Sequence, residues 1–286
     1  MNATKKRTMQ FENLEDRRVM TAGVDIDLDD GVLEVEGSEK SEKIYIQYHD
    51  HDEVEVKIYQ EKDGKWKLKK RKDYDLDKVD EIKVFAGAGN DYVVNRTDIE
   101  MTAYGETGND TLYGGGGNDS LWGMDGHDRL VGRDGHDRID GGSGNDRLYG
   151  LDGNDIMTGQ AGRDYLSGGD DHDVMNGGKD NDRLGGGRGN DALYGGSGDD
   201  HLFGNNDHDK LYGQSGTDYL SGGAGNDWID GGNDHTTDTL YSGGGYDHIV
   251  QHHNLKPGIF GIKFWQAEES IRDASWYDTV KNEYHR

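Results

Sequence analysis

Single large aliphatic residues recur every nine positions along residues 105–230, and polar residues and glycines fill the positions between them. In one unit, the residues GGSGND at 141–146 are turn formers, and RLY at 147–149 predicts a short strand whose middle residue points to one face. Two units return the chain over itself, so successive coils of 18 residues stack about 4.8 Å apart. The pattern therefore predicts an all-β solenoid in which two parallel sheets enclose two facing ladders of leucines.

The repeat G-x-x-G-x-D-x-U-x, where U is a large aliphatic, continues for fourteen units without a slip. Its first position is Gly in every unit, and its fourth is Gly except at Asp171, Asp180 and Asp207. Looser units flank the run around Asp91 before it and around Asp238 and Asp247 after it, where a two-residue insertion within 228–237 shifts the register. Such unbroken periodicity predicts a repeat architecture.

Stacking coils of 18 residues sorts the position-six carboxylates into two columns, one on each edge. The first column is Asp110, Asp128, Asp146, Asp164, Asp182, Asp200 and Asp218, and the second is Asp119, Asp137, Asp155, Asp173, Asp191, Asp209 and Asp227. Carboxylates about one strand spacing apart repel one another unless a cation neutralises them. Carboxylate and carbonyl oxygens suit a hard cation, and calcium accepts their irregular geometry more readily than magnesium. Six gaps per column predict about twelve calcium ions.

Composition agrees with a chain that needs bound cations. Hydrophobic residues make up 31% of the sequence and the formal net charge is −26, a combination typical of disorder unless a ligand cancels the charge. Twelve divalent ions would nearly cancel this net charge. The chain has no Cys and therefore no disulfide or thiolate metal site, and no apolar run is long enough for a membrane span. Its acidity also disfavours nucleic acid as a partner.

The fourteen units resemble the RTX, or hemolysin-type, calcium-binding nonapeptide G-G-x-G-x-D-x-U-x. This resemblance implies a right-handed parallel β-roll whose ions lie between turns 18 residues apart, held by the position-six Asp and by turn carbonyls. Asp128 and Asp146 would then share one ion, and Asp137 and Asp155 another. A residue other than Gly at position four strains the turn, so calcium occupancy near Asp171, Asp180 and Asp207 stays open.

The flanks differ from the repeat and divide the chain into four parts. Residues 1–23 contain FENLEDRRVMTA, which resembles an N-terminal segment of large exported bacterial proteins. Residues 24–104 alternate polar and apolar positions and predict a β-rich segment that leads into or caps the roll at 105–250. Residues 251–286 predict a small cap or a C-terminal secretion signal of the kind that RTX proteins carry. Both termini favour secretion.

Other chemistries find less support. His127, His136, His172 and His208 all occupy position five, where Asn is the usual alternative, and their spacing forms no tetrahedral cluster. The stretch HDHDE at 49–53 lies between two strand-like segments and predicts a hairpin loop. No HExxH, GxSxG or GxxxxGK[ST] motif occurs, so we expect no enzyme. A hydrolase site in residues 1–104 is the remaining enzymatic alternative.

The sequence thus predicts a secreted, calcium-binding RTX repeat protein that folds on calcium outside the cell and has a structural or interaction role. One alternative is a calcium-dependent carbohydrate-binding or adhesive module, because outward positions of the strands carry aromatic residues and Arg129, Arg147 and Arg183. Those aromatics are Tyr113, Trp122, Tyr149, Tyr165, Tyr194, Phe203, Tyr212, Tyr219 and Trp228. An extracellular polysaccharide or a cell surface is the partner this face suits. The biological purpose and the oligomeric state stay open.

Overall fold

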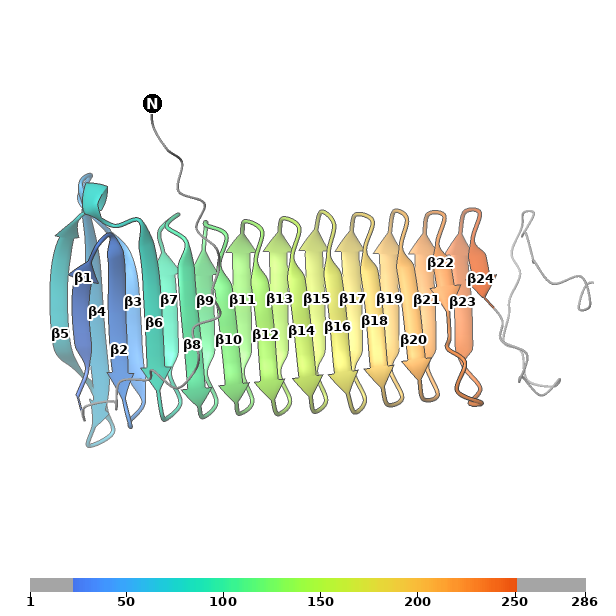
Figure 1. Ribbon diagram of the computed structural model, residues 1–286, viewed down its shortest axis with the longest axis horizontal. Helices are drawn as coiled ribbons and strands as arrows, with labels where there is room; N and C mark the ends of the chain where they lie inside the picture. Colours follow the sequence, from blue (N-terminus) through green and yellow to red (C-terminus); the bar gives the residue numbers. More distant parts are fainter. Residues whose placement is uncertain (1–22, 251–286) are drawn as a thin grey trace, which may run out of the picture.

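The computed structural model describes residues 23–250, which form two twelve-stranded sheets and no α-helix (Figure 1). The segments at 1–22 and 251–286, with the expected export segment and C-terminal cap or secretion signal, lie outside the described residues. Sheet A runs in the order β1 (Asp25–Asp29), β2 (Val32–Ser38), β6 (Glu81–Gly87), β8 (Met101–Thr107), β10 (Ser120–Asp125), β12 (Arg138–Ser143), β14 (Ile156–Ala161), β16 (Val174–Lys179), β18 (Ala192–Ser197), β20 (Lys210–Ser215), β22 (Trp228–Asp230) and β24 (His248–Val250).

Sheet B faces sheet A across the core and holds the remaining strands. Its order is β23 (Thr239–Gly244), β21 (Tyr219–Ala224), β19 (His201–Asn206), β17 (Arg183–Arg188), β15 (Tyr165–Asp170), β13 (Arg147–Asp152), β11 (Arg129–Asp134), β9 (Thr111–Gly115), β7 (Tyr92–Arg96), β3 (Glu42–His49), β4 (Glu53–Lys62) and β5 (Lys65–Asp75). A short 3-10 turn, η2 (Leu76–Lys78), follows β5. From β6 onward, the chain alternates between the two sheets.

Parallel pairing within each sheet advances by one coil of 18 residues. Leu121 of β10 pairs with Ile139 of β12, and Leu130 of β11 pairs with Leu148 of β13. The step lengthens at the C-terminal insertion, where Leu220 pairs with Leu240. This register confirms the predicted β-solenoid and its coil length.

The strands are longer than the three residues that the sequence predicted. β13 covers Arg147–Asp152, so it continues through the first three positions of the next unit. Leu151 has a left-handed φ of 89° and still pairs with Arg133 of the preceding coil. The left-handed residue does not interrupt the pairing of the strand with its neighbour. Only the residues at positions four, five and six therefore form the turn between the two sheets. The prediction treated all six Gly-rich positions as turn and was wrong for the first three.

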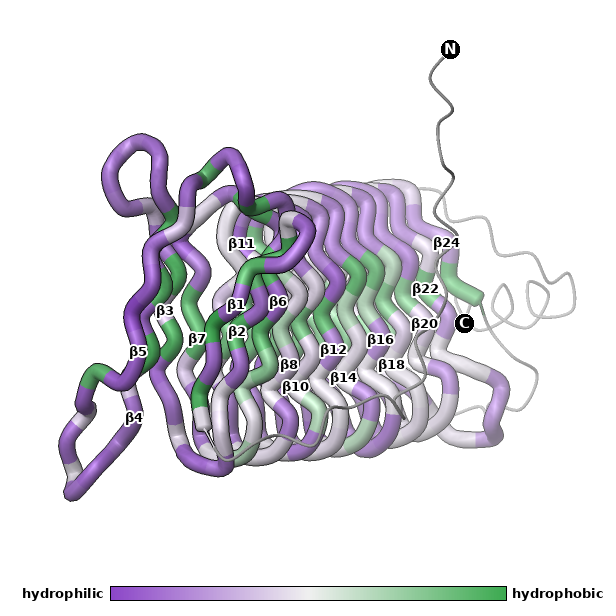
Figure 2. Tube along the Cα trace, turned by 60° about the vertical axis from the view of Figure 1, so that its left-hand side comes forward, coloured by the Kyte–Doolittle hydropathy of each residue, from purple (hydrophilic) through white to green (hydrophobic). Residues whose placement is uncertain are grey.

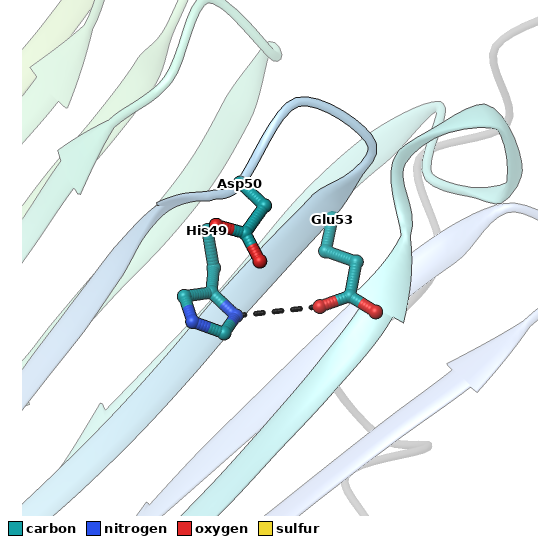
Figure 3. Close-up of side chains that lie close together, drawn as sticks. All are labelled: His49, Asp50 and Glu53. Atoms are coloured by element: carbon teal, nitrogen blue, oxygen red, sulfur yellow. Dashed lines mark hydrogen bonds and ion pairs between the residues drawn. The ribbon is translucent and has the colours of Figure 1, made fainter.

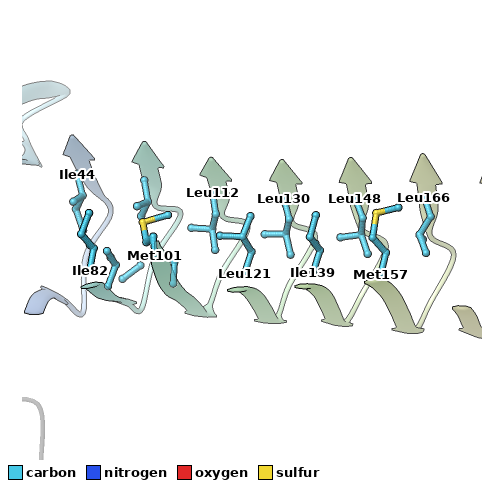
Figure 4. Close-up of a cluster of buried hydrophobic side chains, with 14 of the residues drawn as sticks. Ile44, Ile82, Met101, Leu112, Leu121, Leu130, Ile139, Leu148, Met157 and Leu166 are labelled. Carbon is cyan, nitrogen blue, oxygen red and sulfur yellow. The ribbon is translucent and has the colours of Figure 1, made fainter. Parts of the chain in front are cut away.

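The core is a double row of aliphatic side chains between the sheets (Figure 4). Leu130 and Leu148 of sheet B face Leu121 and Ile139 of sheet A, and all four are at most 1% exposed. Figure 2 shows these hydrophobic positions side by side in the middle of the strands, with hydrophilic residues at the turns. Each coil therefore contributes only two large side chains to a thin core.

The N-terminal end of the solenoid has a thicker and more conventional core. The antiparallel hairpin β1–β2 extends sheet A, and the antiparallel strands β3, β4 and β5 extend sheet B. Ile26, Leu33, Ile44, Val56 and Ile58 are buried there and join the same hydrophobic cluster as the roll. The sheets and the core thus run continuously from this end into the repeats.

Leu166→Ala tests the contribution of one ladder position. We expect the calcium-saturated protein to lose about 2–5 kcal/mol of unfolding free energy, because the stacked coils cannot close the cavity. Urea denaturation followed by circular dichroism measures this. Val174→Ala is the matched control: Val174 is 44% exposed, so its loss should cost less than about 0.5 kcal/mol. Equal effects of the two substitutions would contradict a leucine-ladder core.

Candidate metal centre

The fourteen predicted aspartates form the two expected columns along the edges of the solenoid. Each is at most 3% exposed, although its carboxylate lies at a turn. The side-chain Oδ1 accepts a hydrogen bond from the backbone N–H of a residue one coil earlier. Asp128 N donates to Asp146 Oδ1 at 2.8 Å, and Asp137 N donates to Asp155 Oδ1 at 2.8 Å. The structure therefore brings together both residue pairs that the resemblance linked.

The second carboxylate oxygen, Oδ2, has no partner. In all fourteen aspartates and in Asp91, this atom is buried and lacks a hydrogen-bond donor within the part of the chain that the structure describes. A buried polar atom left unsatisfied costs roughly 1–3 kcal/mol, and more when it is charged. None of the ion pairs found within residues 23–250 involves any of the fourteen. Among the described residues, no cationic side chain therefore pairs directly with these carboxylates.

Glycine at position one leaves room for this oxygen. A Cβ at Gly141 would lie 2.5 Å from Asp146 Oδ2 and 3.0 Å from the carbonyl oxygen of Gly159 in the next coil. Both atoms are acceptors that face the same space above Gly141. An array of converging oxygens without donors matches what a hard divalent cation requires. The residues present therefore fit calcium, and the arrangement explains why position one is Gly in every unit.

Burial changes the acid strength of the columns. It raises the pKa of Asp119, Asp173 and Asp182 to about 8, and that of Asp137 and Asp146 to about 6. The backbone hydrogen bond at Oδ1 opposes this rise in pKa without cancelling it. For Asp173, the carboxylates of Asp155 and Asp191 add to the rise. Ionised, unneutralised columns thus oppose folding.

The columns extend beyond the fourteen residues. Asp218 N donates to Asp238 Oδ1 at 2.9 Å, and Asp227 N donates to Asp247 Oδ1 at 3.0 Å. At the other end, Asp91 N donates to Asp110 Oδ1 at 2.7 Å. The looser flanking units contain all three of these residues, but their shifted register left them outside the predicted ligand set.

Uncharged donors close both columns at the N-terminal end. Asp91 Oδ1 accepts the backbone N–H of Glu42, whose own carboxylate accepts hydrogen bonds from Ser38 Oγ at 2.7 Å and Gln60 Nε2 at 2.8 Å. The other column ends where Met101 N donates to Asp119 Oδ1 at 2.7 Å. Backbone donors therefore satisfy Oδ1 of the first carboxylates, Asp91 and Asp119, where no earlier coil is present, and their Oδ2 atoms stay without a donor like those of the other column residues.

The residues at position five form a second row of hydrogen bonds between successive coils, in addition to the row formed by the aspartates. His172 N donates to Asn154 Oδ1 at 2.8 Å, and Asn190 N donates to His172 Nδ1 at 2.7 Å. An acceptor at Nδ1 requires a neutral imidazole with its proton on Nε2. Asn and His alternate because each offers an acceptor at the same place. The histidines thus have a structural role as acceptors between coils.

The three aspartates at position four adopt the strained backbone that was expected. Asp171, Asp180 and Asp207 have φ values of 76°, 71° and 74°. At this position a Cβ on Gly144 would lie 1.6 Å from the carbonyl oxygen of Gly126, so glycine also permits close stacking. Asp tolerates the left-handed region better than most residues do. The turn geometry is therefore retained at a local cost.

A separate group of ligand-type side chains lies at the tip of the β3–β4 hairpin (Figure 3). His49 Nδ1 lies 3.3 Å from Glu53 Oε2 and 3.4 Å from Asp73 Oδ1. Glu55 Oε1 lies 2.6 Å from Arg71 Nε, so its charge is neutralised locally. These contacts join side chains of β3, β4 and β5, and the loop predicted at residues 49–53 is confirmed by the turn between β3 and β4.

Comparison with protein families agrees with this geometry. The RTX calcium-binding nonapeptide repeat matches overlapping stretches at 102–130, 122–157, 131–166, 149–184, 185–220, 203–237 and 212–249, which together span more than half of the chain. The chain belongs to the RTX calcium-binding nonapeptide repeat family. No curated protein matches this RTX chain. Within residues 23–250, it contains no helix long and apolar enough to cross a bilayer.

The raised pKa values predict a pH effect on the calcium-free RTX roll. Folded-state pKa values of about 6 to 8 exceed the ordinary value of 3.8, so the folded chain binds protons more tightly than the unfolded chain. The stability of the roll is therefore greatest at low pH and falls as pH rises through that range. In a chelator, the strand signal in circular dichroism should be stronger at pH 6.5 than at pH 8.5.

The control for this pH effect replaces the four position-five histidines with Asn, the residue that alternates with them. This variant keeps an acceptor at each of these positions but has no imidazole there, so the same pH dependence should persist if the carboxylates cause it. A chelated protein that gains structure toward pH 8.5 would show that the carboxylates are not what opposes folding.

Proposed function

We propose that this RTX chain is a secreted structural module whose roll folds when calcium occupies the gaps between successive column aspartates. One observation carries the proposal: every coil of the repeat buries carboxylate oxygens for which the described chain supplies no donor. Protein architecture normally satisfies buried polar groups, so a repeated omission at equivalent atoms points to an external partner. A divalent cation with oxygen ligands is the partner that suits carboxylates and carbonyls together.

The column aspartates would hold the ions in pairs one coil apart, as in Asp128 with Asp146 and Asp137 with Asp155. Backbone carbonyls facing the same spaces, such as that of Gly159 in β14, would complete the oxygen shell. Bound calcium supplies positive charge that removes both the repulsion along a column and the desolvation cost of its carboxylates. Oδ1 meanwhile keeps its backbone hydrogen bond, which fixes the orientation of each carboxylate before an ion arrives.

About twelve ions follow from six gaps in each predicted column. Asp91, Asp238 and Asp247 lengthen the columns and add up to three further gaps. The turns at Asp171, Asp180 and Asp207 should bind most weakly, since their backbone is already strained. Titration with calcium would establish the count.

Secretion and a role outside the cell are also part of the proposal. Free calcium is scarce in the cytosol and abundant outside it, where even weak sites fill. A chain without Cys needs no oxidising compartment for folding, so calcium alone can supply the signal that it has left the cell. We further propose that it has no catalytic activity, because its carboxylates are committed to the columns.

Calcium should induce the fold of the roll. In a chelator at pH 8.5, where the column carboxylates are ionised, we expect strand signal only from the N-terminal end, whose conventional core does not depend on the columns. Adding millimolar calcium should produce the remaining strand signal and a smaller hydrodynamic radius, whereas equal magnesium should not. Circular dichroism and size-exclusion chromatography measure both effects. A metal-free protein with the same compactness and melting curve as the calcium-loaded one would overturn the proposal.

Asp146→Asn should remove calcium sites. Its Oδ1 can still accept the Asp128 N–H, but an amide nitrogen replaces the free oxygen, so the two gaps it borders should lose about one to two ions. Asp152→Asn is the matched control, since Asp152 is an exposed position-three residue on the opposite edge. Isothermal titration calorimetry gives the stoichiometry. Identical ion counts and melting temperatures for the two variants would argue against column ligands.

A further inference from the structure

The middle of the outer face of sheet B carries no acidic side chain. On the eight strands β9, β11, β13, β15, β17, β19, β21 and β23, positions seven and nine of each unit point outward, and none of these positions is Asp or Glu. We call these two rows of residues the sheet B face. Acids on the same strands lie only at the strand ends, at Asp134, Asp152 and Asp170. Sheet A differs, because its equivalent rows include Asp140 and Asp230.

Arginines on the sheet B face have no acidic partner within the described chain. Arg129 and Arg147 are direct neighbours in the β11–β13 register, and Tyr165 separates Arg147 from Arg183 in the same row. None of the three takes part in the ion pairs found among residues 23–250. Like charges side by side in a sheet are destabilising. An anion lying across the row would remove that cost.

Aromatic rings continue the sheet B face and pack against two of its arginines. The Arg129 guanidinium lies 4.4 Å from the centre of the Tyr149 ring, and that of Arg183 lies 4.5 Å from the Phe203 ring. Stacking of this kind leaves guanidinium N–H groups available in its plane. The ring centres of Tyr149 and Tyr165 lie 5.8 Å apart. The sheet B face therefore presents aromatic rings and arginine guanidinium groups side by side.

The dimensions of the face suit an extended ligand. Eight neighbouring strands at about 4.8 Å spacing make a strip about 34 Å long. Figure 1 shows the strands side by side along the long axis of the solenoid. One strand spacing is close to the length of one sugar ring in an extended chain, so successive sugars could meet successive coils. Guanidinium groups bind carboxylates and sulfates through paired hydrogen bonds, and aromatic rings pack against the apolar faces of sugars.

We propose that the sheet B face binds an extended acidic polysaccharide. The inference rests on the proposed function, because the face exists only when the roll has formed. Acidic sugars fit better than neutral ones because the arginines have no acidic partner. A polysaccharide fits better than an acidic peptide because the row interleaves rings with the arginines. The outer face of sheet A is less suited to a polyanion, because its equivalent rows carry Asp140 and Asp230.

Binding of calcium-loaded protein to dextran sulfate, to soluble oligogalacturonate and to unmodified dextran tests the proposal, with biolayer interferometry as the measurement. We expect binding to at least one acidic glycan and none to dextran. The two acidic probes distinguish sulfate from carboxylate as the preferred group. The triple variant Arg129→Gln, Arg147→Gln and Arg183→Gln should weaken binding at least about tenfold, because it removes three charged hydrogen-bonding groups.

The matched control places the same loss of charge on the other sheet, as Arg138→Gln, Lys179→Gln and Lys210→Gln, and should retain wild-type affinity. Equal losses in both triple variants, equal binding to polyglutamate, or no binding to either acidic glycan would overturn the proposal. A change of oligomeric state in the sheet B variant alone would also overturn it and assign the face to a second copy of the chain. Circular dichroism with and without calcium separates these outcomes from a failure of the roll to fold.

Discussion

A buried carboxylate with one satisfied and one unsatisfied oxygen is the constraint on which the rest of this solenoid depends. Oδ1 ties each Asp to the backbone of the preceding coil, so the carboxylates are held in line even though they repel one another. Oδ2 faces a space that glycine keeps open, next to a carbonyl oxygen of the following coil. The glycines, the turns and the coil length all serve this alignment.

Stability is distributed unevenly along the molecule for the same reason. At the N-terminal end, antiparallel strands enclose Ile44, Val56 and Ile58, and the first column stops near the neutral donors Ser38 and Gln60. Beyond β8 the core thins to two large side chains per coil, while each coil adds two buried carboxylates. One end thus resembles an ordinary β-protein, and the remainder relies on neutralisation of its edges. In repeat proteins, such an end provides a surface onto which further coils can add.

The two outer faces show that the repeat constrains only part of each unit. Positions one, four, six and eight are set by the turn, the carboxylate and the core. Positions seven and nine are free of these requirements, so the outer residues are available for other functions. On sheet B they hold Arg129, Arg147 and Arg183 among aromatic rings, whereas sheet A carries acids at Asp140 and Asp230. This segregation follows from the alternation of units between sheets.

The all-β solenoid, the buried leucine positions and the pairing of Asp128 with Asp146 could be predicted from the sequence, because each nine-residue unit holds one turn and one strand and two such units return the chain over itself, as the RTX resemblance also implies. The sequence also marked the three unusual turns at position four. Only the tertiary structure decided the features that depend on neighbouring coils. These are the six-residue strands, the hydrogen bond that Oδ1 accepts while Oδ2 has no donor, and the role of His172 as an acceptor. The tertiary structure also placed Asp238 and Asp247 in the columns despite the insertion. Those features arise from contacts one coil apart, whose geometry a linear pattern does not contain.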